Sequence, residues 1–135
     1  MEEPSYKTLD RLISQLSQRF VEVEVKRRVV TPDVDILDVE CIYKTFRVII
    51  SEIIETTKRK YAYLLLDSSN DIVVIFDNSP DWKVAQLKYG VNYRIHSKER
   101  IPHKHSYKRQ EITLTSEMTL TDFLMWIEHQ FPPKD

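Results

Sequence analysis

Residues 36–66 read ILDVECIYKTFRVIISEIIETTKRKYAYLLL, and this stretch carries the strongest indication of fold class. It is rich in β-branched and aromatic residues, which favour strands over helices. Short polar segments at 43–45 and 56–58 divide it into three parts. The sequence therefore predicts three consecutive strands, joined as a meander, over residues 36–42, 46–54 and 59–66.

Further strand patterns lie on both sides of this meander. Before it, residues 21–26 alternate valine with charged residues, as in a strand with one buried face. After it, a polar turn at 67–71 leads into a hairpin strand at 72–76. Residues 83–89 fit either a helical turn or an irregular loop. Short strands are also predicted at 91–95, as an edge strand, and at 112–114.

A helix is predicted at each end of the chain. Ser5 can cap a first helix whose apolar residues recur every three or four positions up to Phe20. Thr119 and Asp122 form a capping pair ahead of a second apolar pattern, which two prolines end. We therefore predict a single α+β domain over residues 1–135. It comprises a mostly antiparallel, twisted sheet of about five to seven strands with an N-terminal and a C-terminal helix.

The composition argues against several protein classes. At 135 residues, with 41% hydrophobic and 30% charged residues, the chain can bury one core but not two. Cys41 is the only cysteine, so there is no internal disulfide framework, and its apolar neighbours predict a buried thiol. Gly90 is the only glycine, so phosphate-binding glycine loops are absent and no nucleotide cofactor is expected.

The sequence also bears on location. Residues 1–4 are acidic where a secretory signal would be basic. No apolar run approaches the roughly 18 residues that a membrane-spanning helix requires. We therefore expect a cytoplasmic protein with no membrane partner.

Two short polar motifs are the best candidates for chemistry. The first is Phe76-Asp77-Asn78-Ser79-Pro80, at the end of a predicted strand, and the second is Pro102-His103-Lys104-His105. In an extended segment, His103 and His105 point to one side and Lys104 to the other. The plain alternative is an Asx turn before proline and two surface histidines in a basic loop.

Two kinds of chemistry fit these residues. A metal could bind His103 and His105, but it would need a third ligand such as Asp77 or His96. The interpretation we favour from sequence needs no metal. One imidazole takes the 2′-hydroxyl proton of RNA and the other protonates the leaving oxygen, while Asp77 orients a ring. The sequence thus predicts His103, His105 and Asp77 as catalytic residues, with no metal and no cofactor.

Basic residues are concentrated between positions 83 and 111, whereas the chain on either side is acidic. Tyrosines interleave with them, a composition suited to phosphate contacts and stacking on unpaired bases. The alternative is a solvated, lysine-rich loop or edge that resists aggregation. The predicted nucleic-acid-binding residues are Arg94, Lys98, Arg100, Lys104, Lys108 and Arg109.

The order of these motifs resembles the TumE-type proteins, which are regarded as the toxin partners in a class of bacterial and archaeal toxin–antitoxin pairs. The resemblance covers mainly the second half of the chain. It rests on Tyr61-Ala62-Tyr63 in a strand, the turn at 67–71, Asp77-Asn78-Ser79-Pro80, Pro102-His103-Lys104-His105 and a closing helix at 120–129. The family implies toxicity and a cognate antitoxin protein as partner. The spacing between the two polar motifs is longer here than in the family pattern, which marks residues 84–100 as an inserted segment.

Two functional classes therefore remain open. The first is a toxin component that acts on nucleic acid, as a possible ribonuclease using His103 and His105. The second is a non-catalytic module in which the basic segment docks RNA or an acidic partner protein. The exposed edge of a meander also allows two copies to pair as a homodimer.

Overall fold

A computed structural model describes residues 14, 20–106 and 110–133 of the chain. Its elements follow in the order β1 (Val21–Val30), β2 (Val34–Tyr43), β3 (Phe46–Glu55), β4 (Arg59–Leu66), β5 (Ile72–Asp77), α2 (Trp82–Tyr89), the 3-10 helix η1 (Gly90–His96), β6 (His103–Ser106), β7 (Glu111–Leu114) and α3 (Leu120–Gln130). The seven strands form one sheet in chain order, and every neighbouring pair is antiparallel. The predicted α+β class is confirmed.

Most of the individual predictions hold, with two errors. The valine face of the strand at 21–26 was predicted to be buried, but Val21 is 60% and Val25 43% exposed. The meander, the hairpin strand and the short strand at 112–114 are all present. The predicted edge strand at 91–95 is wrong, because these residues form η1. Gly90, with φ at +62°, ends α2 and starts this tighter turn, and Tyr93 then packs against the α2 cluster rather than joining the sheet. The predicted N-terminal helix lies outside the described residues.

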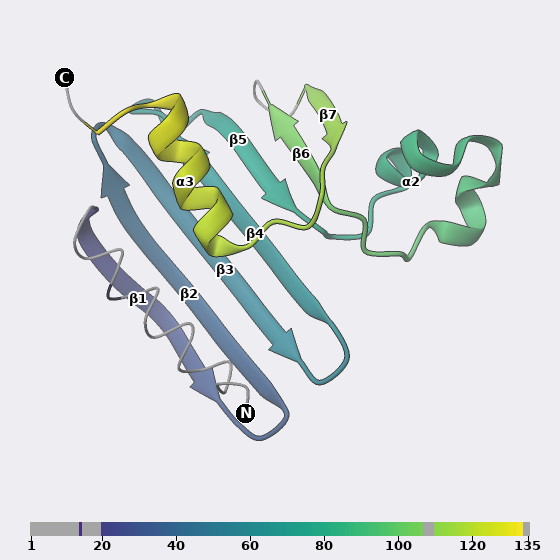
Figure 1. Ribbon diagram of the computed structural model, residues 1–135, viewed down its shortest axis with the longest axis horizontal. Helices are drawn as coiled ribbons and strands as arrows, with labels where there is room; N and C mark the ends of the chain where they lie inside the picture. The colour runs from purple at the N-terminus through teal and green to yellow at the C-terminus, as the bar shows by residue number, and fades with distance from the viewer. Residues whose placement is uncertain (1–13, 15–19, 107–109, 134–135) are drawn as a thin grey trace.

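The main core lies between the sheet and α3, which crosses one face (Figure 1). Phe123 is fully buried there, with its ring stacked on Tyr63 at a centroid distance of 5.2 Å and edge-on to Phe76 at 5.9 Å. The helix begins at the predicted capping box, in which Thr119 and Asp122 satisfy each other's backbone N–H groups. Cys41 is buried in the same core, and burial raises the pKa of its thiol to about 12.

A buried ion pair fixes the approach to α3. The Arg59 guanidinium lies 3.1 Å from the Glu52 carboxylate, which also accepts a hydrogen bond from the Tyr63 hydroxyl. The same guanidinium donates to the carbonyl of Met118 at 2.7 Å, just before the helix cap. Arg59 thus compensates the negative charge of the buried Glu52. It also connects β4 to the segment that leads into α3.

The α2–η1 segment (residues 82–96) projects beyond the end of the sheet, next to β6 and β7 (Figure 1). It has a small apolar cluster of its own, in which Val84 and Ala85 of α2 are buried with Ile101. Ile112 of β7 packs against this cluster and joins it to the sheet. The segment therefore packs against β7 and against Ile101, which leads into β6, the strand that carries the second polar motif.

Candidate functional site

The structure brings the two polar motifs together. Asp77 ends β5 and lies directly across from His103 of β6, while His105 lies across from Ile75 in the same ladder. Side chains that face each other across a ladder point to the same side of the sheet. Asp77, His103 and His105 therefore share the face opposite α3. We call these three residues the acid–histidine cluster.

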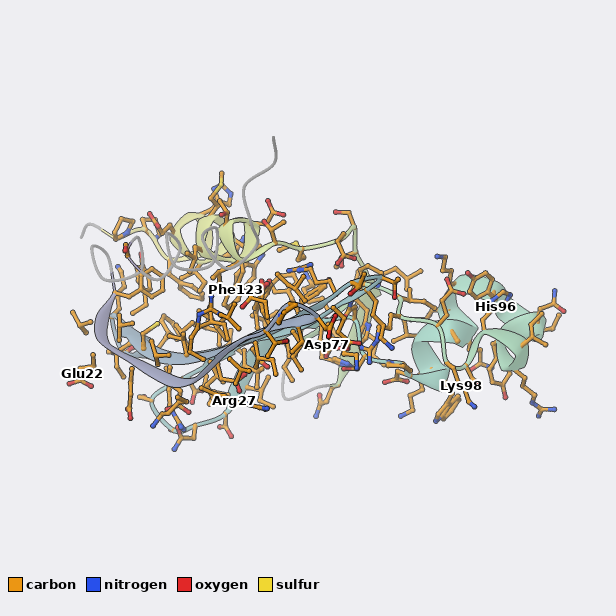
Figure 2. The ribbon with its side chains drawn as sticks, turned by 90° about the horizontal axis from the view of Figure 1, so that it is seen from below. Glu22, Arg27, Asp77, His96, Lys98 and Phe123 are labelled. Atoms are coloured by element: carbon orange, nitrogen blue, oxygen red, sulfur yellow. The ribbon has the colours of Figure 1, made fainter. Side chains whose placement is uncertain are left out.

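The cluster is buried where the sheet meets the α2–η1 segment, as the position of Asp77 in Figure 2 shows. Only 1% of His103, 5% of His105 and 8% of Asp77 is exposed. The two imidazole rings meet edge to face, with centroids 4.9 Å apart. One potential ligand atom from each of the three residues lies within 4.8 Å of the other two.

The His103 ring is held at both nitrogens. Its Nδ1 lies 2.7 Å from the carbonyl oxygen of Ile101, which can only accept, so Nδ1 carries the proton and donates. Its Nε2 lies 3.1 Å from Oδ1 of Asp77. The orienting carboxylate that the sequence predicted is therefore in contact with an imidazole, and that imidazole is His103.

Electrostatics favour a charged pair at this contact. Burial alone would raise the pKa of Asp77, but hydrogen bonds from His103 and from the backbone N–H of Ser79 outweigh it and hold that pKa below its ordinary value. Burial likewise opposes the charge on His103, yet Asp77 and the Ile101 carbonyl raise the pKa of its ring above the usual value. Both shifts favour the charged forms, an imidazolium facing a carboxylate.

Asn78, which the sequence placed in the same polar motif, serves the scaffold instead. Its side-chain oxygen accepts from the backbone N–H of Tyr61 at 3.1 Å, and its amide nitrogen donates to the carbonyl of Arg59 at 2.8 Å. The Asn78 side chain thus pairs with the β4 backbone in the way that a further residue of β5 would, one position beyond the end of that strand. This holds the end of β5, and with it Asp77, in place.

Replacing Asn78 with alanine is expected to lower the free energy of unfolding by about 1–3 kcal/mol. The change leaves two backbone groups of β4 without their partners at a buried site. Urea unfolding of the variant measures the loss. The control is Ser79→Ala, at an exposed position that contributes its backbone N–H to Asp77, and this variant is expected to match the parent protein. Equal stability of the two variants would contradict the role given to Asn78.

The predicted nucleic-acid-binding residues do not gather at the cluster. Arg94 belongs to η1 and Lys98 follows it, and Figure 2 shows Lys98 beside the projecting segment, apart from Asp77. Arg100 lies at the strand end and approaches the carbonyl of Asn78 at 3.4 Å. Lys104 points to the opposite face of the sheet from the two histidines, as predicted. Lys108 and Arg109 lie outside the described residues.

His96, the other third metal ligand considered from sequence, is also away from the cluster. Its ring stacks on Tyr89 with a centroid distance of 3.5 Å, and its Nδ1 lies 3.0 Å from Glu99. Figure 2 places it on the projecting segment, well apart from Asp77. The sequence offered Asp77 and His96 as alternatives for the third metal ligand. The structure brings Asp77 to the histidine pair and leaves His96 in a separate contact.

The α2–η1 segment carries an exposed aromatic surface. Trp82 is 53% exposed, and its ring centroid lies 6.4 Å from that of Tyr93. Lys83 lies over the Trp82 ring and Arg94 over the Tyr93 ring, each with its charged group 5.6 Å from the ring centroid. We call these four residues the stacking surface. The sequence offered one signal for it, because each aromatic residue is followed directly by a cation.

An open groove lies between α2 and β7. It is lined by Lys83, Gln86, Leu87, Gln110 and Ile112. Ile112 lies directly across from His105 in the β6–β7 ladder, so the groove begins one strand away from the cluster.

Comparison with known proteins finds no matching family model, no matching curated protein and no matching solved structure. No helix among the described residues has the length and apolar character needed to cross a membrane.

Proposed function

We propose that this protein is the toxin component of a toxin–antitoxin pair, that it acts on RNA in the cytoplasm, and that the acid–histidine cluster is its reactive site. One observation carries the proposal. The carboxylate of Asp77, which is far in the sequence from His103 and His105, has a potential ligand atom within 4.8 Å of one from each imidazole. Their motifs are also those in which the chain resembles TumE-type toxins.

The chemistry proposed is cleavage of an RNA phosphodiester by acid and base catalysis. One imidazole takes the 2′-hydroxyl proton while the 2′-oxygen attacks phosphorus, and the other protonates the 5′-oxygen as its bond to phosphorus breaks, which leaves a 2′,3′-cyclic phosphate. Asp77 keeps the His103 ring in one orientation. Because both rings are buried, a local opening of the fold around them is required before a phosphodiester can reach them.

The stacking surface is the proposed RNA-binding site of the same protein. Trp82 and Tyr93 offer ring faces on which unpaired bases can stack, and the two neighbouring cations can contact the phosphates. The groove between α2 and β7 continues from α2 towards the strand next to His105. RNA bound along this path would have its backbone near the cluster.

A growth experiment tests the proposal. Expression of the parent chain in a bacterial host is expected to arrest growth and fragment total RNA, while the His103→Ala/His105→Ala double variant does neither. The control is His129→Ala, an exposed histidine of α3, which should remain fully toxic. Circular dichroism of the purified variants separates lost chemistry from lost fold. Undiminished RNA cleavage by a folded double variant would rule out the cluster as the reactive site.

A second candidate function is a non-catalytic module that binds RNA or an acidic protein. One observation favours it: both nitrogens of the His103 ring already make contacts within the protein. Absence of growth arrest would support this alternative, whereas growth arrest with intact RNA would keep the toxin and discard the ribonuclease chemistry. For the toxin, we propose a cognate antitoxin protein as partner. A homodimer formed through a sheet edge stays a prediction, with β1 and β7 as the two edge strands.

A further inference from the structure

The acid–histidine cluster has the composition of a metal centre. Two imidazoles and a carboxylate are a donor set found in zinc sites that keep a fourth position open. All three residues are buried, and their potential ligand atoms lie within 4.8 Å of one another. A backbone ladder fixes their spacing, because β5 and β6 pair in register at this point.

The orientation of His103 is the second observation. A ligating histidine usually donates its other ring N–H to a carbonyl or carboxylate, which fixes the tautomer and aims the free nitrogen at the metal. His103 does this: Nδ1 donates to the Ile101 carbonyl at 2.7 Å, and Nε2 points towards Asp77. The hydrogen bond to Ile101 can persist when Nε2 binds a metal.

The spacing of one ligand pair, His103 and Asp77, is the third observation. Ligand bonds of about 2.0–2.1 Å at tetrahedral angles place two ligand atoms roughly 3.3 Å apart. Nε2 of His103 and Oδ1 of Asp77 are 3.1 Å apart. A neutral Nε2 and a carboxylate oxygen are both acceptors, so a cation must lie between them. That cation is either a proton or a metal ion.

We propose that the acid–histidine cluster binds one zinc ion through Nε2 of His103, a ring nitrogen of His105 and the carboxylate of Asp77. Two imidazole ligands favour zinc over magnesium, which prefers oxygen donors in octahedral geometry. The inference reverses the metal-free interpretation favoured from sequence. It keeps the site named in the proposed function but replaces the acid–base chemistry there, because Nε2 of His103 cannot transfer a proton while it binds zinc, and it stands on the geometry of the cluster alone.

Zinc binding by the purified full-length chain tests this inference. After dialysis against a chelator, the chain is titrated with zinc in a calorimeter, and its zinc content is then measured by mass spectrometry. We expect one zinc per chain and a rise in melting temperature on addition of zinc. His105→Gln and Asp77→Asn should each weaken zinc binding by at least tenfold. The matched control is His96→Gln, which removes a histidine from the contact with Glu99 and should leave zinc binding unchanged.

The outcomes separate the zinc site from the proposed function. Absence of zinc binding by the folded parent chain would overturn the zinc site, as would equal affinity in the His105→Gln and parent proteins. The zinc site would also be overturned if His96→Gln lost zinc binding while Asp77→Asn kept it. That result would place the metal on the projecting segment. Stoichiometric zinc without growth arrest would support the zinc site and overturn the toxin proposal. RNA cleavage by a chain that binds no zinc would support the proposed function and overturn the zinc site.

Discussion

Replacing Phe123 with alanine is expected to lower the free energy of unfolding by about 3–5 kcal/mol, as is typical when a fully buried aromatic side chain is truncated. Phe123 is completely inaccessible to solvent, between α3 and the sheet (Figure 2). Its ring contacts those of Tyr63 and Phe76, so the alanine variant loses two aromatic contacts as well as buried area. The truncation also leaves a cavity in the centre of the core.

Urea unfolding followed by circular dichroism measures this effect. The matched control is Met125→Ala, on the same helix but 63% exposed, which should change the free energy of unfolding by no more than about 0.5 kcal/mol. The pair of variants separates core packing from any change in helix propensity. A loss of similar size at both positions would show that α3 does not pack on the sheet as described.

The second large effect is expected at the buried ion pair. Changing Arg59 to methionine should cost about 3–5 kcal/mol, because it leaves the Glu52 carboxylate buried without its compensating charge. Methionine keeps much of the length and apolar stem of arginine, so the loss reports mainly on charge. The variant also loses the hydrogen bond to Met118 that positions the start of α3.

The double variant Glu52→Gln/Arg59→Met is expected to recover part of this loss, because it removes the unpaired charge as well. Thermal or urea unfolding of the two single variants and the double variant gives the coupling energy. The control is Arg47→Met, whose partner Glu40 lies at a more exposed position, and its expected cost is at most about 1 kcal/mol. A double variant less stable than Arg59→Met alone would contradict this account of the pair.

The fold was predictable where short-range patterns govern structure. Valine–charge alternation predicts β1, and the capping pair of Thr119 and Asp122 marks the start of α3. The error at residues 91–95 has a tertiary cause. Their alternation fits a strand, but Gly90 and the packing of Tyr93 on the α2 cluster favour a 3-10 helix. Such an outcome depends on packing against Val84, Ala85 and Ile101, which the alternation within residues 91–95 does not reveal.

The candidate site was predictable in its residues but not in its geometry. Residue types identified Asp77, His103 and His105, and the structure brings these three together. The burial of the cluster could not be predicted, because it depends on how the chain around β5 and β6 packs in three dimensions. The sequence also gives no sign that Asn78 and Asp77 have different roles. Asn78 has a structural role because its side chain pairs with backbone groups at the start of β4.

The order of the strands has a consequence for how the chain folds during synthesis. Each strand pairs with the one made just before it, so the sheet can grow from β1 to β7 as the chain leaves the ribosome. α3 follows all seven strands along the chain, yet it covers the aromatic side chains of β4 and β5. A nascent chain therefore passes through a stage in which the sheet is formed without this cover, when it depends most on chaperones to avoid aggregation.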